Sequence, residues 1–220
     1  MGPERKFTPT EGCLEHNFML QEVLDDARRN SKQTCIAWLD LANAFPSIPH
    51  QSLFYILQKI GLTEQQLSLI QDLYTGSTTA IRHSSGLTNP IPFNAGVRQG
   101  CPLSPLLLNL AMEMLIRPVL AQVNTAGYSL RNTRINILAY ADDLCILART
   151  PQEFQLLLNT LQEAAQWIGL TFKPSKCGSL HMLKNKAQKT KFFLNKSPIP
   201  ILDEGDSSQH LGVPTGARVD

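Results

Sequence analysis

The sequence has no apolar run that approaches the roughly 20 residues needed to cross a bilayer. Its first residues, Met1–Lys6, lack the apolar core of a secretory signal peptide. Cys-x-x-Cys pairs are missing as well, although the chain holds five cysteines, an odd number. Several of these stand inside apolar segments, which favours buried free thiols in a reducing compartment. We therefore expect an intracellular protein without a membrane partner.

Internal repeats and low-complexity segments are also absent, which leaves an ordinary globular fold. The 220 residues are 43% hydrophobic and 17% charged, a composition typical of soluble globular proteins. A chain of this length holds one sizeable core or two small ones.

Acidic residues are missing from one long stretch. Between Glu163 and Asp203 there is none, whereas lysine recurs throughout. Two interpretations stay open: a solvated lysine-rich face, or a surface that meets a phosphate backbone. The lysines are Lys173, Lys176, Lys184, Lys186, Lys189, Lys191 and Lys196.

Hydrophobic periodicity and capping signals predict alternating helices and strands. The expected helices are 14–27, 51–60, 63–74, 104–118 and 150–169, and the expected strands are 34–39, 135–139, 144–148, 179–183, 199–202 and 210–213, with strands or loops at 78–94. Thr63, with Gln66 three residues on, is expected to cap its helix. Ser104 and Thr150 are expected to cap theirs, each with a proline at the first helical position. The order predicts an α+β fold in which helices cover a small sheet on one face.

Two adjacent carboxylates, Asp142 and Asp143, follow Tyr140 and Ala141 at the bend between two apolar runs. Interpreted as a β-hairpin, the segment holds both acids at the tip of buried strands. Aspartate is also a favoured turn residue, so a purely structural role stays open. The absence of glycine from the turn and the preceding aromatic residue speak against that simpler interpretation.

Asp40 ends the almost wholly apolar segment 34–39. Alone it would be a turn or helix-cap residue, but in one sheet its strand end can lie beside the hairpin. Asp40, Asp142 and Asp143 would then converge, and such carboxylates repel each other unless cations share them. Magnesium prefers carboxylate and phosphate oxygens, and two ions about 4 Å apart can activate a hydroxyl and stabilise a leaving phosphate. The pattern predicts phosphoryl or nucleotidyl transfer.

Three segments, 40–45, 96–105 and 140–143, occur in the order of reverse-transcriptase motifs A, B and C. The chain resembles the reverse transcriptases of non-LTR (LINE-type) retrotransposons, most of all the branch that inserts at fixed ribosomal-DNA sites. Segment 12–17 is similar to the helix before motif A in that branch.

The resemblance covers residues 11–214, between tails at 1–10 and 215–220. It implies a polymerase palm, a small antiparallel sheet covered by helices, with part of the fingers and no thumb. It places motif A at 34–46, B at 94–113, C at 135–148, D at 151–176 and E at 209–213.

The resemblance also implies roles for individual residues. Asp40 and Asp142 would bind both of two Mg²⁺ ions, with Mn²⁺ as an alternative, and Asp143 would complete the set. Lys176 would protonate the leaving pyrophosphate as a general acid, or is simply one exposed lysine among several. Residues 210–213 would steady the primer terminus through sugar and base contacts.

On the nucleotide side, Phe45 would act as the steric gate against a ribose 2′-hydroxyl, which is compatible with a place in the core. Gln99 and Gly100 would lie against the incoming nucleotide and the template, because glycine permits a close backbone approach. Arg98 would reach phosphate or face solvent. Tyr140 would support the primer end.

Two positions depart from the family pattern. Pro46 stands where a polar or small residue is usual, so the chain's turn away from the site is expected to differ. Lys173 stands where motif D commonly has asparagine, which leaves the hydrogen bonding of that loop open.

The implied activity is that of an RNA-directed DNA polymerase acting in the nucleus on an RNA template, a DNA primer and dNTPs. The fingers strands, thumb and endonuclease of a complete element are expected elsewhere in a parent polyprotein. One alternative is a truncated or co-opted fragment that binds nucleic acid without polymerising. Another is a polymerase of a different lineage, such as a group II intron-type reverse transcriptase.

Overall fold

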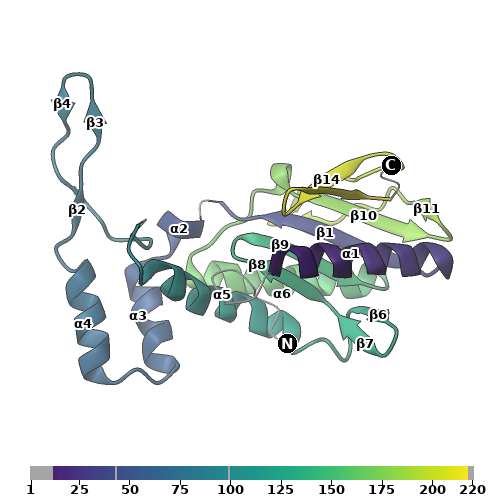
Figure 1. Ribbon diagram of the computed structural model, residues 1–220, viewed down its shortest axis with the longest axis horizontal. Coiled ribbons are helices and arrows are strands. Elements are labelled where there is room, and N and C mark those ends of the chain that lie inside the picture. Colours follow the sequence, from purple (N-terminus) through teal and green to yellow (C-terminus); the bar gives the residue numbers. More distant parts are fainter. Residues whose placement is uncertain (1–11, 43, 99, 218–220) are drawn as a thin grey trace.

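The computed structural model describes residues 12–42, 44–98 and 100–217. Its centre is a five-stranded sheet in the order β11-β10-β1-β9-β8, in which every neighbouring pair is antiparallel. The strands are β1 (Thr34–Asp40), β8 (Ile137–Tyr140), β9 (Asp143–Ala148), β10 (Gly178–Leu183) and β11 (Lys186–Ala187). The α+β prediction is confirmed, and the apolar segment 34–39 is the central strand (Figure 1).

One face of the sheet packs on α5 (Ser104–Leu120) and α6 (Pro151–Ile168), and α3 (His50–Lys59) extends the same core by packing on α5. Alternate residues of β1, Cys35, Ala37 and Leu39, belong to this core, as the two-residue period of a strand requires.

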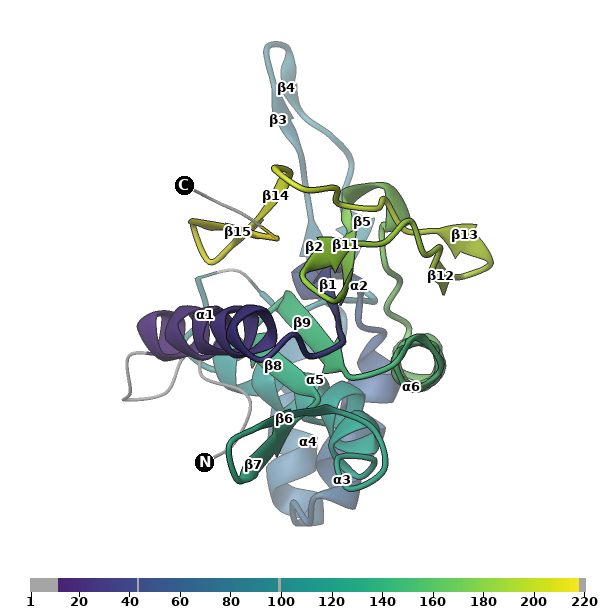
Figure 2. The same cartoon turned by 90° about the vertical axis from the view of Figure 1, so that its right-hand side faces the viewer.

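The opposite face is also covered. Ile36 and Trp38 of β1 point to a second core, which α1 (Gly12–Arg29) fills with Leu20, Val23, Leu24 and Ala27 (Figure 2). The prediction of helices on one face only is therefore wrong. The reason is visible in β1 itself, since a strand with no polar alternation must be buried on both faces.

Between the predicted motifs A and B the chain leaves the central sheet. After α2 (Ala44–Ser47) and α3 comes α4 (Glu64–Tyr74), and then a long hairpin made of β2 (Thr78–Thr79), β3 (Arg82–His83), β4 (Gly86–Leu87) and β5 (Ile91–Pro92). This arm, residues 77–93, projects away from the rest of the molecule (Figure 1).

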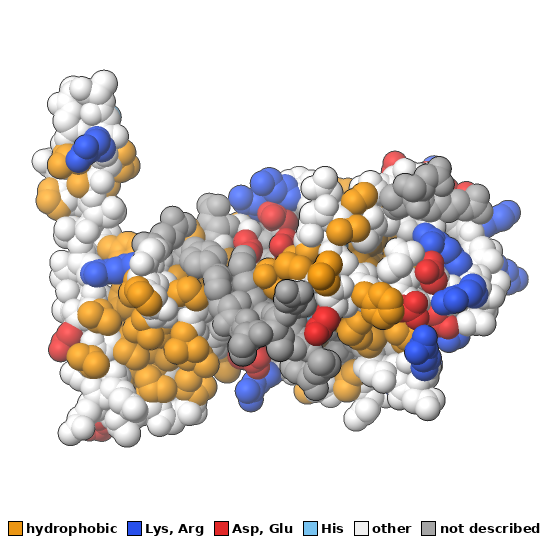
Figure 3. Space-filling view, viewed as in Figure 1, with side chains coloured by type: hydrophobic (Ala, Val, Ile, Leu, Met, Phe, Trp, Pro, Cys, Tyr) orange, Lys and Arg blue, Asp and Glu red, His pale blue; other side chains and the backbone are white. Residues whose placement is uncertain are grey.

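The outer surface is uneven in character. Hydrophobic side chains gather around α3, α4 and α5, whereas Lys and Arg side chains are more frequent at the end away from the arm (Figure 3). The exposed apolar residues around α4 and α5 include Leu69, Leu73 and Leu106.

Smaller elements complete the chain. They are β6 (Tyr128–Leu130), β7 (Thr133–Ile135), the 3-10 turn η1 (Pro174–Lys176), β12 (Phe193–Leu194), β13 (Ser197–Pro198), β14 (Ser207–His210) and β15 (Val213–Gly216). The strand predicted at 210–213 is wrong, because Leu211 and Gly212 have positive φ angles of 49° and 79° and form the turn between β14 and β15. Of the strand predicted at 199–202, only Ile201 makes a bridge, to Ser179.

The predicted helix caps are confirmed at two of three positions. Thr63 and Gln66 form a reciprocal capping box, and Thr150 Oγ1 accepts from the Glu153 N–H at 3.3 Å. Ser104 does not cap its helix, because it is already the first helical residue and follows Leu103.

A polar network links α1 to β6. The Tyr128 hydroxyl donates to Asp26 Oδ2 at 2.6 Å, and Lys32 Nζ lies 2.7 Å from the same oxygen. Burial alone would raise the pKa of Asp26, but the hydrogen bonds from Lys32, Tyr128 and Asn30 outweigh it and lower the pKa. The charged carboxylate therefore stabilises the folded state.

We expect Asp26→Asn to lower the free energy of unfolding by about 1–2 kcal/mol at pH 7. Because the folded pKa lies below the unfolded one, the stabilisation is complete above the ordinary value of 3.8 and is lost as the pH falls through the folded pKa. Urea unfolding at pH 7 and pH 3 checks this. The control is Asp72→Asn, at an exposed position of α4, and equal pH slopes for wild type and Asp26→Asn would contradict the assignment.

The end of α6 depends on a glycine. Gly169 has φ +83°, and a Cβ added there would lie 2.5 Å from Pro49 Cδ. Gly61, which follows α3, has a similar φ of +96° but nothing within 4 Å of an added Cβ. The two positions therefore separate backbone strain from steric clash.

Gly169→Ala is expected to destabilise the fold by about 2–4 kcal/mol and Gly61→Ala by only about 1 kcal/mol. Both variants carry the left-handed strain, and only the first meets the rigid proline ring. Urea unfolding of the two variants measures the difference. Equal losses would show that the Pro49 contact yields without cost.

Candidate active site

The two predicted strand ends lie side by side. Asp40, the last residue of β1, is paired with Asp143, the first residue of β9, in the antiparallel register. Directly opposed residues project from the same face of a sheet with Cβ atoms about 5 Å apart. Asp142 lies in the intervening turn beside Ala141, whose φ is 53°, and Tyr140 pairs with Asp143 across it.

The donor set fits a hard divalent cation. Asp40 is half-buried and Asp143 is exposed, so carboxylate oxygens stand at an open edge where phosphate and water can add further oxygen ligands. In the part of the chain that the structure describes, no group of three or more His, Cys, Asp or Glu side chains is already arranged as a metal site. The protein thus offers part of a coordination sphere, and the metal role of the set stays a prediction.

Motif D is joined to motif A through the backbone. The Ala42 N–H donates to the Thr171 carbonyl at 2.8 Å, and the Lys173 N–H donates to the Asp40 carbonyl at 3.0 Å. Since Lys173 acts here through its main chain, its departure from the family pattern leaves this hydrogen bond intact.

Cys177 also contacts the end of β1, at Asp40. Its Sγ accepts from the Asp40 N–H at 3.4 Å and donates to the Lys173 carbonyl at 3.3 Å. Burial, with the charge of Asp40, raises the pKa of the thiol to about 11, although the Asp40 N–H acts in the opposite direction. The protonated thiol is therefore a structural donor. Sequence reasoning missed this role, because nothing near Cys177 in the sequence indicates a contact with Asp40.

A small cavity of about 90 Å³ adjoins the carboxylate pair. Asp40, Asp143 and Lys176 line it together with Trp38 and residues 208–210 of β14. Lys176 is exposed and lines the same cavity, so the predicted general acid lies near Asp40 and Asp143.

Residues of the predicted motif E divide into two environments. His210 is only 2% exposed, whereas Gly212 and Val213 of the turn are exposed. Direct contact with a primer is therefore open to the turn and closed to the His210 ring.

The start of motif B is held by the segment that follows motif A. The Gly96 N–H donates to the Ile48 carbonyl at 2.7 Å, and the His50 N–H donates to the Asn94 carbonyl at 3.2 Å. His50 Nε2 lies 3.0 Å from the Gly96 carbonyl, and burial lowers the pKa of the ring, so the neutral imidazole donates this bond. Sequence reasoning gave His50 no role, because only the fold brings it to Gly96.

Aromatic rings surround that histidine. Tyr74 and Phe93 meet the His50 ring at 4.7 Å and 5.2 Å between centroids, both edge to face. Such pairs favour a fixed geometry and give motif B a rigid base.

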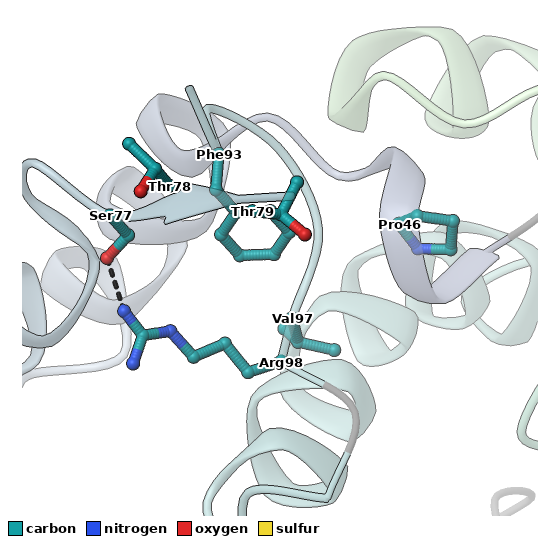
Figure 4. A pocket seen from close by; sticks show the side chains of 7 residues that line it. All are labelled: Pro46, Ser77, Thr78, Thr79, Phe93, Val97 and Arg98. Atoms are coloured by element: carbon teal, nitrogen blue, oxygen red, sulfur yellow. Dashed lines mark hydrogen bonds between the residues drawn. The ribbon is translucent and has the colours of Figure 1, made fainter. Parts of the chain in front are cut away.

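Arg98 lies on the wall of an open cavity of about 590 Å³ (Figure 4). Its guanidinium donates to Ser77 Oγ and stands over the Tyr74 ring, 5.7 Å from the centroid. The cavity is lined by Pro46, Ser77, Thr78, Thr79, Phe93, Val97 and Arg98. The Arg98 side chain is thus exposed to solvent and held by contacts at the base of the arm. Both predicted roles, a contact with phosphate and a purely solvent-facing position, are compatible with this arrangement.

The structure describes only some of the remaining predicted site residues. Gly100 is exposed with φ +86°, a conformation that favours glycine. Tyr140 is half-buried and meets His16 edge to face, with ring centroids 6.5 Å apart. Gln99 and the side chain of Phe45 lie outside the described residues. Pro46 belongs to the single-turn helix α2, which shows how the chain leaves motif A.

All five cysteines are free thiols, with Cys35, Cys145 and Cys177 buried. Within residues 12–42, 44–98 and 100–217, no helix combines the length and the apolar character needed to span a membrane.

Comparison with known proteins identifies the family to which the chain belongs. Residues 3–213 match the family described as "Reverse transcriptase (RNA-dependent DNA polymerase)". The retrovirus-related Pol polyprotein of the type-2 retrotransposable element R2DM from Drosophila melanogaster is 30% identical over 96% of this chain and 20% of its own length. That of the type-1 retrotransposable element R2 from Nasonia vitripennis is 31% identical over 96% of this chain and 21% of its own length.

The fold agrees with this assignment. A solved structure of apo telomerase from Candida tropicalis, truncated from its C-terminal domain, has a TM-score of 0.60 and covers 88% of this chain and 38% of its own. At 11% identity this likeness shows the fold alone. The chain spans about a fifth of the R2 polyproteins that it matches. The predicted resemblance to non-LTR retrotransposon reverse transcriptases is confirmed, and the chain belongs to the reverse transcriptase family.

Proposed function

We propose that this chain is the palm of an RNA-directed DNA polymerase that transfers nucleotidyl groups from dNTPs to a primer 3′-hydroxyl. The observation that carries the proposal is the register of Asp40 against Asp143, with Asp142 in the adjoining turn, in a member of the reverse transcriptase family. In the reaction the 3′-hydroxyl attacks the α-phosphate in line, and pyrophosphate leaves.

Asp40 and Asp142 would hold two Mg²⁺ ions, or Mn²⁺, and Asp143 would complete the set. When bound, these ions would supply Lewis acidity to the attacking hydroxyl and the leaving phosphate. The half-exposed carboxylate edge supports this role, because triphosphate oxygens must reach the same ions.

Lys176 would give its proton to the leaving pyrophosphate. Its place beside Asp40 and Asp143 supports the role, and the hydrogen bond from Lys173 to Asp40 fixes the start of the turn that carries it.

The nucleotide and template would approach from the side of motif B. Phe45 would exclude a ribose 2′-hydroxyl, and Gln99 and Gly100 would lie against the nucleotide and the template. Arg98, braced by Tyr74 and Ser77, would contact phosphate. Tyr140, packed on His16, would support the primer end.

The partners of the complete protein would be an RNA template, a DNA primer and dNTPs, with the palm acting in the nucleus as one part of a larger polyprotein. The lengths of the R2 polyproteins support the larger parent. Their other regions would contribute the fingers strands, the thumb and the endonuclease.

A second candidate is a fragment that binds nucleic acid without polymerising. The observation that favours it is the exposure of most lysines in the acid-free stretch, including Lys184, Lys186 and Lys191. Salt-sensitive RNA binding by this chain without primer extension would support that function.

Primer extension on an RNA template with Mg²⁺ tests the first candidate. The protein assayed carries fingers and thumb regions from an R2 relative, joined to this chain. Asp142→Asn is expected to reduce extension to background, because a neutral amide cannot hold the ions, and Asp72→Asn on α4 is expected to leave it unchanged. Equal extension by Asp142→Asn, or an inert parent protein, would overturn the proposal.

In the same assay Lys176→Ala is expected to lower kcat by about 10²-fold, as the loss of a general acid does. Lys184→Ala removes an exposed lysine from the same stretch, outside the cavity, and is expected to leave kcat unchanged. Single-turnover rates measured across pH check the role. A Lys176→Ala variant with wild-type kcat and pH profile would show that the lysine only faces solvent.

A further inference from the structure

The 90 Å³ cavity beside the carboxylates is lined by two residues whose side-chain nitrogens are buried without a hydrogen-bond partner within the described residues. These are His210, through Nε2, and Trp38, through Nε1. Their side chains come from different elements, β14 and β1, and are only 2% and 4% exposed. The coincidence of both groups in one cavity needs an explanation.

Buried polar groups are hydrogen-bonded as a rule, because leaving a donor or acceptor unpaired costs free energy. The volume of the cavity is enough for about three water molecules at roughly 30 Å³ each. Asp40 and Asp143 also line it, so water inside would have the two to four polar partners that an ordered molecule requires.

The backbone geometry explains how these groups meet. Trp38 precedes Asp40 by two residues on β1, so both side chains project from the same face as the opposed Asp143. Across that face lies the β14–β15 hairpin (Figure 1). Gly178 of β10 lies beside this hairpin, since a Cβ added there would be at an ordinary contact distance of 3.5 Å from Ser208 Oγ.

The chemistry of the two nitrogens suits a directed chain of hydrogen bonds. Indole Nε1 only donates, a carboxylate only accepts, and a neutral imidazole has one donor and one acceptor nitrogen. Burial lowers the pKa of His210 to about 4, so the ring is neutral near pH 7 and brings no positive charge to the carboxylates. Water, which both donates and accepts, can join a donor and an acceptor of this kind across the cavity.

We propose that His210 and Trp38 hold ordered water in this cavity and that His210, through that water, is a positioning residue for Asp40 and Asp143. The inference rests on the proposed function only in taking these carboxylates as metal ligands. It assigns the ring of His210 to the inside of the palm, in place of the primer contact that its motif implied.

The water itself is tested on this chain by NMR. The Trp38 indole N–H, assigned by its loss in Trp38→Phe, is expected to show a cross-peak to long-lived bound water. Trp167, which is 54% exposed, supplies the reference for ordinary solvent exchange. Absence of the Trp38 cross-peak in the wild-type chain would overturn the proposal, and this readout requires neither activity nor a His210 variant.

The positioning role is tested with Mn²⁺ alone as the probe. His210→Phe fills a similar space without polar atoms and is expected to weaken Mn²⁺ binding by 10- to 100-fold, whereas His210→Gln is expected to retain most of the affinity. His83→Phe, the same change at an exposed position of β3, serves as the matched control. Affinity for a primer–template duplex, measured by fluorescence anisotropy, is expected to stay constant in both His210 variants.

Each contrary outcome has one meaning. Unchanged Mn²⁺ affinity in a folded His210→Phe variant, or equal losses in the Phe and Gln variants, would overturn the positioning role. Weaker duplex binding with unchanged Mn²⁺ binding would return His210 to a primer contact. Failure of the proposed polymerase activity is separate, because it appears in the Asp142→Asn extension assay and leaves the Trp38 water signal in place.

Discussion

The antiparallel register between β1 and β9 sets Asp40 opposite Asp143, and the rest of the site is arranged around that pair. Register is strongly specified here because β1 is buried on both faces, and a slip by one residue would exchange its two cores. Cys35, Ala37 and Leu39 would then face α1, and Ile36 and Trp38 would enter the core against α5 and α6. The packing of the strand is what holds two like charges next to each other.

The backbone that carries the carboxylates is held by hydrogen bonds, whereas the carboxylates themselves are open to solvent. The end of β1 is held by the main-chain hydrogen bond from Lys173 to Asp40 and by the bond from the Asp40 N–H to Cys177 Sγ. The His50 contacts hold the start of the predicted motif B. In front, the acids meet solvent at the edge of the sheet, where their repulsion is reduced by water and is relieved by bound cations. A preorganised oxygen set on a buried scaffold suits a two-metal reaction, because little rearrangement is then needed when substrate phosphates arrive.

Much of this arrangement could be predicted from sequence, and each failure has its own physical cause. The unbroken apolar segment before Asp40 indicated a central strand, and Thr63 with Gln66 indicated a helix start, since both signals are local. The second face was missed because an amphipathic helix such as α1 does not state which side of a sheet it covers. The segment 210–213 predicts a strand because Leu211 and Val213 are apolar residues two positions apart, whereas positive φ angles at Leu211 and Gly212 make it a turn. The contact between Cys177 and Asp40 joins segments that are far apart in the sequence, as does the cavity that His210 shares with the carboxylates, and neither leaves a local pattern.

The central claim is that the opposed carboxylates bind divalent metal together with a nucleotide, and calorimetric titration of the chain with dNTP in Mg²⁺ tests it most directly. The account predicts binding that requires Mg²⁺ and is lost in both Asp40→Asn and Asp142→Asn, while Asp72→Asn binds as the wild type does. Binding of equal affinity in the wild type and in folded Asp40→Asn, or binding that does not depend on Mg²⁺, would contradict it.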